Sequence, residues 1–99
     1  MSLSKINGYD TFTLFHQGPV DQYYLAYVDV PSDHPIYGRF YEDIKVPQLP
    51  YKVTYSRLLS PNGPWRIGFD TAQRSNLFLT ENDVKIALNT LVDWLASLN

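Results

Sequence analysis

The sequence contains no cysteine. This absence excludes disulfide bonds, thiolate zinc sites and cysteine nucleophiles, and it fits a reducing cytoplasm. No stretch approaches the roughly 20 apolar residues that a membrane-spanning helix needs, and the opening MSLSKINGYD has no apolar run of the kind found in signal peptides. We therefore expect a cytoplasmic protein that makes no membrane contact.

Basic charge is also sparse. The net charge is −2, and the eight basic residues are scattered along the chain. Duplex nucleic acid is bound by dense cationic faces, so this charge pattern argues against it as a partner. The two histidines, His16 and His34, lack metal-ligand spacing, and neither a nucleophile elbow nor a glycine-rich phosphate loop is present. The adjacent Glu42 and Asp43 are typical of solvated charges after a helical turn. We assign no catalytic residue, metal or cofactor.

The length and composition of the chain indicate one folded domain. It has 99 residues, of which 44% are hydrophobic, enough for a single core. We expect a flexible N-terminus over residues 1–8, followed by one α+β domain over 9–99. The β-forming stretches 11–17 and 23–30 are separated by Gly-Pro and predict a first hairpin.

A second hairpin is predicted from two alternating stretches, 51–59 and 64–71. Their apolar sets share one face only if paired positions sum to an even number, for example Tyr55 opposite Phe69. A two-residue Asn-Gly turn would give an odd sum, so we expect a longer loop or a bulge. Between the two hairpins, residues 31–50 contain several prolines and predict an irregular crossing.

The clearest element is a C-terminal helix over residues 81–98. Thr80 and Asp83 form a capping-box pattern at its start. Its apolar stripe recurs at spacings of three and four and predicts packing on one face of an antiparallel sheet of about four strands. The stretch 23–30 is apolar on both faces, which indicates a central strand, or a strand whose second face is covered by the crossing or by another subunit. The last alternative would make the protein a homodimer. The stripe consists of Val84, Leu88, Leu91, Leu95 and Leu98.

Two stretches are rich enough in polar and aromatic residues to bind a partner. One is HPIYGRFYEDIKV (34–46) in the crossing, and the other is GFDTAQRSN (68–76) at the end of the second hairpin. Tyrosine, tryptophan and arginine dominate binding hot spots, and arginines near the hairpin could grip an anion or an acidic partner. The predicted partner-binding residues are His34, Tyr37, Tyr41, Arg57, Arg66, Asp70, Gln73 and Arg74.

The segments YVDVPSDHPIYGRFYEDIKV, YKVTYSRL and GPWRIGFDTAQRSN together resemble a group of small, mostly hypothetical proteins of tailed bacteriophages and prophages. That group has the patterns HP.YG..Y.D, V.GGLTY after a histidine, and W.GFD.AH..D. The likeness covers residues 27–76. It implies a phage or prophage origin and an accessory role in the host cytoplasm.

The chain departs from that pattern where side chains could do chemistry. Leu49-Pro50-Tyr51 stands in the histidine-glycine-glycine segment, Gln73 replaces a histidine, and Asn76 replaces an aspartate. These departures weaken an enzymatic role.

Three hypotheses therefore follow. The first is a non-enzymatic binding module for a host or phage protein, with inhibition of a host defence protein as one role. The second is a small-ligand, for example nucleotide, binding protein. The third is a hydrolase-like enzyme with a reduced site at His34 and Asp70.

Overall fold

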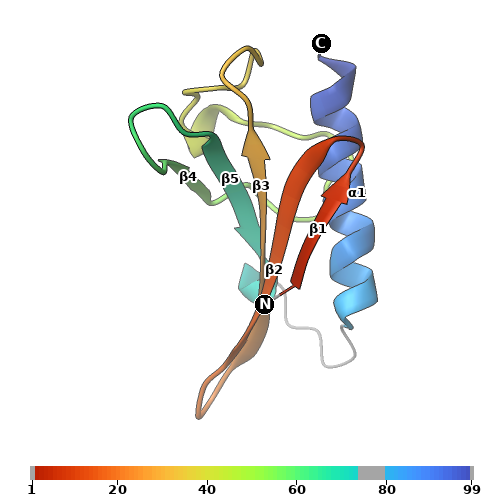
Figure 1. Ribbon diagram of the computed structural model, residues 1–99. Helices are drawn as coiled ribbons and strands as arrows, with labels where there is room; N and C mark the ends of the chain where they lie inside the picture. The colour runs from red at the N-terminus through yellow and green to blue at the C-terminus, as the bar shows by residue number, and fades with distance from the viewer. Residues whose placement is uncertain (1, 74–79, 99) are drawn as a thin grey trace.

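The computed structural model describes residues 2–73 and 80–98, which form an antiparallel sheet with a helix packed on one face (Figure 1). The strands lie in the order β1-β2-β3-β5-β4. This arrangement confirms the α+β class and the C-terminal helix, with five strands where about four were predicted. The elements are β1 (Ser2–Ile6), β2 (Tyr9–Gln17), β3 (Gln22–Val30), η1 (Tyr41–Asp43), β4 (Tyr55–Leu58), β5 (Trp65–Asp70), η2 (Thr71–Gln73) and α1 (Glu81–Ser97).

The additional strand lies within the first eight residues, for which the sequence predicts a flexible N-terminus. Strand β1 pairs with β2 through a two-residue turn, Asn7-Gly8, in which both residues have positive φ (50° and 86°). This is the geometry of the tight turns that match the twist of a hairpin, and Asn-Gly is their preferred sequence. Thr11 binds the Ser4 hydroxyl at 2.8 Å and donates to the Ser4 carbonyl. The chain therefore enters the sheet at residue 2.

The predicted register of the second hairpin is wrong by one residue. Tyr55 lies opposite Gly68, not opposite Phe69, and residues 59–64 form the connection. The reason is steric: Gly68 lacks a side chain, and this leaves room for Tyr27 on β3 and Tyr55 on β4 to meet across it, with ring centroids 5.1 Å apart. Tyr55 therefore points to the opposite face from Phe69, and 51–54 lie outside the strand.

Helix α1 begins with the predicted capping box. The Asp83 amide donates to the Thr80 hydroxyl (3.3 Å), and the Thr80 amide donates to the Asp83 carboxylate (2.9 Å). Four of the five stripe residues are buried, whereas Leu98 is the exposed C-cap residue. No helix within residues 2–73 and 80–98 is long and apolar enough to cross a membrane. The buried helix residues are Val84, Ala87, Leu88, Leu91, Val92 and Leu95.

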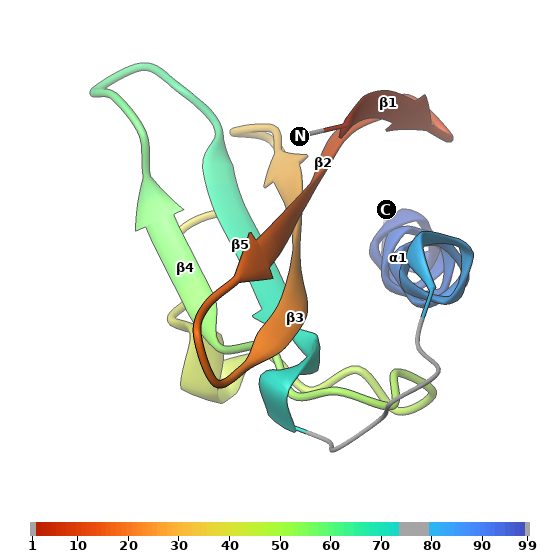
Figure 2. The same ribbon diagram turned by 90° about the horizontal axis from the view of Figure 1, so that it is seen from below.

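The crossing between β3 and β4 lies beside α1 on the same face of the sheet (Figure 2). Its apolar residues Ile36 and Ile44, together with Val53, belong to the same core as the buried helix residues. The expectation that the crossing could cover the second face of β3 is therefore wrong. Within the described residues, the face of the sheet that points away from α1 has no covering element, and we call it the open face.

Candidate functional site

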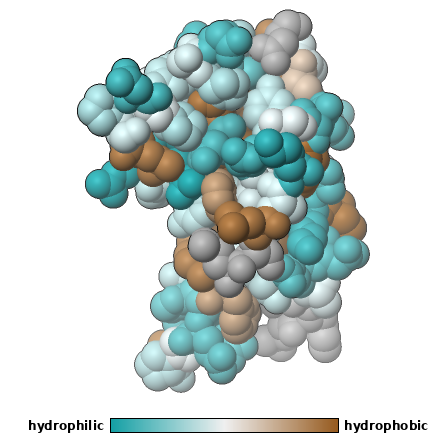
Figure 3. Space-filling view, in the orientation of Figure 1, coloured by the Kyte–Doolittle hydropathy of each residue, from teal (hydrophilic) through white to brown (hydrophobic). Residues whose placement is uncertain are grey.

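A row of aromatic and aliphatic residues, which we call the aromatic row, runs across the open face, perpendicular to the strands. Its members are successive register partners on all five strands, and Leu3 at one end is 66% exposed. In Figure 3, brown hydrophobic patches lie over the sheet in the middle of the view and are bordered by teal hydrophilic residues. Leu14 and Leu25 continue the apolar surface toward the β2–β3 hairpin tip. This aromatic row consists of Leu3, Phe12, Tyr27, Gly68 and Tyr55.

A charged row lies next to the aromatic row. Arg66 donates two hydrogen bonds to the Asp29 carboxylate, at 2.7 and 3.1 Å, and its guanidinium carbon lies 4.1 Å from the centre of the Phe12 ring. The hydrogen bond to Asp29 raises the pKa of Arg66, against the opposing effect of burial. Arg66 is thus fixed by a carboxylate and a ring. This charged row consists of Lys5, Asp10, Asp29, Arg66 and Arg57.

Arg57 differs from its neighbour Arg66. The two are register partners on β4 and β5, but Arg57 is exposed and forms no ion pair with any described residue. At the other edge Lys5 lies 3.4 Å from Asp10. Among the described residues of this face, the guanidinium of Arg57 is therefore the cation that is available to an outside carboxylate or phosphate.

Tyr27 sits at the centre of the aromatic row. Burial raises the pKa of its hydroxyl above the ordinary value of 10.0, and the nearby Tyr55 raises that pKa further. The side chain is consequently neutral at physiological pH. It presents an apolar ring and one hydroxyl, the combination that makes tyrosine effective at interfaces.

His34, the predicted binding residue at the start of the crossing, is buried. Its Nδ1 accepts a hydrogen bond from the Ile36 amide (3.0 Å), which leaves the proton on Nε2 and directs it to the Leu95 carbonyl at 2.7 Å. Both ring nitrogens are thus used to join the crossing to the last turn of α1. His34 therefore has a structural role.

Tyr37 also has a structural partner, since its hydroxyl donates to the Gly63 carbonyl (2.9 Å) and its ring packs near Trp65. Tyr41 is half-buried, packs on Phe40, and its amide donates to the Ser56 hydroxyl. The crossing residues and the arginines are not brought together, because Ser56 lies on the α1 side of β4 whereas Arg57 lies on the open face.

Asp70 ends β5 on the open face, on the same side as Arg66. Its carboxylate accepts hydrogen bonds from the Thr54 hydroxyl (3.2 Å) and from the Ala72 amide (3.1 Å). Gln73 is the last residue of η2, and Arg74 lies outside the described residues. Of the predicted set, the structure thus places Arg57, Arg66 and Asp70 on one surface.

The residues that sequence reasoning missed are the aromatic ones between these charges. Phe12, Tyr27 and Tyr55 lie on three different strands and meet only through the register. The signal available in the sequence was the two-sided apolarity of residues 23–30, which correctly placed β3 in the centre of the sheet.

Within residues 2–73 and 80–98, no group of three or more histidine, cysteine, aspartate or glutamate residues could hold a metal ion. Comparisons of the chain with protein-family models, curated proteins and solved structures found no match.

Proposed function

We propose that this chain is a non-enzymatic binding module that holds a protein partner on the open face of its sheet. The observation that carries the proposal is the aromatic row, an apolar surface across five strands that no described element covers. Contiguous apolar surfaces with a polar border are typical of interaction sites. Tyrosine and arginine, the residues enriched in hot spots, lie side by side on it.

The charges of the open face favour a protein over duplex nucleic acid. On the part of this face that the structure describes, three basic side chains balance three acidic ones, whereas a nucleic-acid site requires an excess of positive charge. Two of the bases are already paired with two of the acids. The basic residues are Lys5, Arg57 and Arg66, and the acidic ones are Asp10, Asp29 and Asp70.

A catalytic role receives less support. In the reduced hydrolase site, His34 and Asp70 would work together, but His34 is bound to Ile36 and Leu95 in the core whereas Asp70 is bound to Thr54 and Ala72. A general base needs a ring nitrogen that reaches the substrate. Both nitrogens of His34 are occupied by the fold.

The partner we propose has an apolar centre and a carboxylate opposite Arg57. The exposed guanidinium supplies the charge complementarity, and the aromatic row supplies the apolar contact area. The resemblance of residues 27–76 to phage and prophage proteins supports a host or phage protein as this partner, with inhibition of a host defence protein as the consequence of binding.

The test compares two double variants on different surfaces. In each, one exposed aliphatic residue and one basic residue are replaced by glutamate. Leu3→Glu with Arg57→Glu alters the two edges of the open face. Ile86→Glu with Lys85→Glu alters the exposed side of α1, where Ile86 is 58% exposed. Proteins captured from a bacterial lysate by the wild type would be identified by mass spectrometry, and the affinity of the purified partner would be measured for all three chains.

We expect the open-face variant to bind the partner at least about tenfold more weakly, a loss of about 1.4 kcal/mol, and the α1 variant to bind like the wild type. Equal binding by all three chains would refute the assignment of the open face. Light scattering supplies a second criterion: if the wild type is a dimer that only the open-face variant splits, the occupant is a second copy and not a different protein.

A further inference from the structure

A separate cavity of about 650 Å³ lies in the loop that includes η1 and leads into β4, within residues 41–54. Its volume falls within the roughly 300–1,000 Å³ that is typical of small-molecule sites. None of its lining residues belongs to the aromatic row or the charged row. Its occupant is consequently a question independent of the proposed function.

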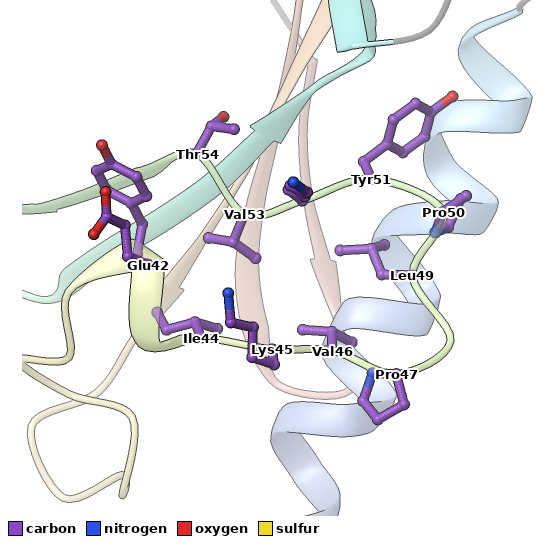
Figure 4. A pocket seen from close by; sticks show the side chains of 12 residues that line it. Glu42, Ile44, Lys45, Val46, Pro47, Leu49, Pro50, Tyr51, Val53 and Thr54 are labelled. Carbon is purple, nitrogen blue, oxygen red and sulfur yellow. The ribbon is translucent and has the colours of Figure 1, made fainter.

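The wall of this loop pocket is mainly apolar. Figure 4 shows Leu49 and Val53 pointing into the ring that the loop forms. Tyr51 is stacked on Phe69, with centroids 5.3 Å apart and planes within 5°, so one face of its ring is already covered. Such a lining favours an apolar ligand body. The apolar lining residues are Tyr41, Ile44, Val46, Pro47, Leu49, Pro50, Tyr51 and Val53.

The charges of the loop pocket favour an anion. Two lysines, Lys45 and Lys52, and one acid, Glu42, line it, so the formal charge of the lining is +1 although that of the whole chain is −2. Lys45 forms no ion pair or hydrogen bond with any described residue, and Figure 4 shows its amine within the ring of the loop. A ligand carboxylate would therefore meet an ammonium group at the pocket without displacing an existing partner.

From the volume, the apolar wall and the local charge we infer that the loop pocket binds a small apolar monocarboxylate. A nucleotide fits these residues less well, because its base edge and sugar need several hydrogen-bonding groups. The hydroxyl of Thr54, which lines the pocket, already donates to Asp70.

The experiment titrates decanoate, its neutral counterpart decanamide, and adenosine monophosphate into the full chain, followed by two-dimensional amide NMR. Decanoate should shift the amides of residues 44, 45 and 53 in a saturable way, and it should bind at least fivefold more tightly than decanamide. Melting temperatures measured at a fixed excess of each probe give an independent readout, since binding to the native state raises them.

Two lysine variants distinguish ligand binding in the loop pocket from binding at other cationic surfaces. Lys45→Gln should weaken decanoate binding at least fivefold and leave decanamide binding unchanged, whereas Lys85→Gln on the exposed side of α1 should change neither. Equal affinity for decanoate and decanamide, shifts confined to other residues, or a response to the nucleotide alone would each overturn the inference. The open-face variant should bind decanoate like the wild type, so the outcome stands apart from that of the protein-partner test.

Discussion

Replacing Gly68 by alanine should destabilise the protein, although the same exchange usually stabilises a strand. A Cβ atom at this position would lie 2.5 Å from the Ala26 carbonyl oxygen and 2.5 Å from the Tyr27 ring. Both distances are far below ordinary van der Waals contact. The ring can shift, but the oxygen belongs to the backbone of a central strand and cannot move without disturbing the ladder between β3 and β5.

The expected size follows from two opposing effects. Removing a glycine from a strand interior contributes about 0.5–1 kcal/mol of stability, because the unfolded chain loses freedom. Overpacking a fitted site costs about 1–3 kcal/mol. The rigid oxygen contact favours the larger costs, so we expect a net loss of about 1–2 kcal/mol. For a chain of this size, such a loss lowers the melting temperature by about 4–16 °C.

Urea unfolding followed by the fluorescence of Trp65 and Trp94 measures this loss directly. Gly18→Ala is the matched control, because its closest contacts are the ends of the flexible Asp21 and His16 side chains, and its stability should change by less than about 0.5 kcal/mol. Combining Gly68→Ala with Tyr27→Ala should cost less than the sum of the single losses, since one of the two contacts is removed. A Gly68→Ala protein as stable as the wild type would refute the close approach of β3 to β5.

Two further predictions concern a half-buried tyrosine and a buried histidine. The pKa of Tyr27 is higher in the folded chain than its ordinary value of 10.0, so its stabilising contribution is complete below about pH 10 and is lost as the pH rises through the folded value. Between pH 9 and 11 the free energy of unfolding should therefore fall less steeply for Tyr27→Phe than for the wild type, and parallel curves would contradict this. His34→Ala removes both imidazole hydrogen bonds and leaves a cavity, so urea unfolding should show a loss of about 2–4 kcal/mol. A loss below about 0.5 kcal/mol would contradict a structural role.

The elements that could be predicted from the sequence are those whose determinants are local. The start of α1 is fixed by Thr80 and Asp83, three residues apart, and its buried face by a repeat of three and four. The first hairpin follows from alternation and a Gly-Pro connection. The strand β1 was missed because its short mixed sequence has little β-preference of its own and gains its partner only through Asn7-Gly8.

The features that could not be predicted depend on pairs that are distant in the chain. The register of β4 is set by the absence of a side chain at Gly68 and by the contact between Tyr27 and Tyr55, 28 positions apart. Alternation alone reports which residues share a face, but not which face of a neighbouring strand they meet.

The same distinction between local and long-range determinants applies to the candidate site. Arg57, Arg66 and Asp70 were predicted from composition, and the structure places them together on the open face. The local sequence does not determine whether a polar residue is exposed to solvent or hydrogen-bonded in the core. His34 was therefore expected at a surface but lies buried against Leu95.

The hydrogen bonds of the His34 imidazole affect how the molecule unfolds locally. One of these hydrogen bonds holds the Ile36 amide within the crossing, and the other reaches the Leu95 carbonyl of α1, 61 positions along the chain from His34. Fraying of the last turn of α1 would break the bond to Nε2, and release of the crossing would break it equally. Partial unfolding should thus involve both segments at once, so that the amides of this helix end exchange with solvent as one cooperative unit with the crossing, not as an independent terminus.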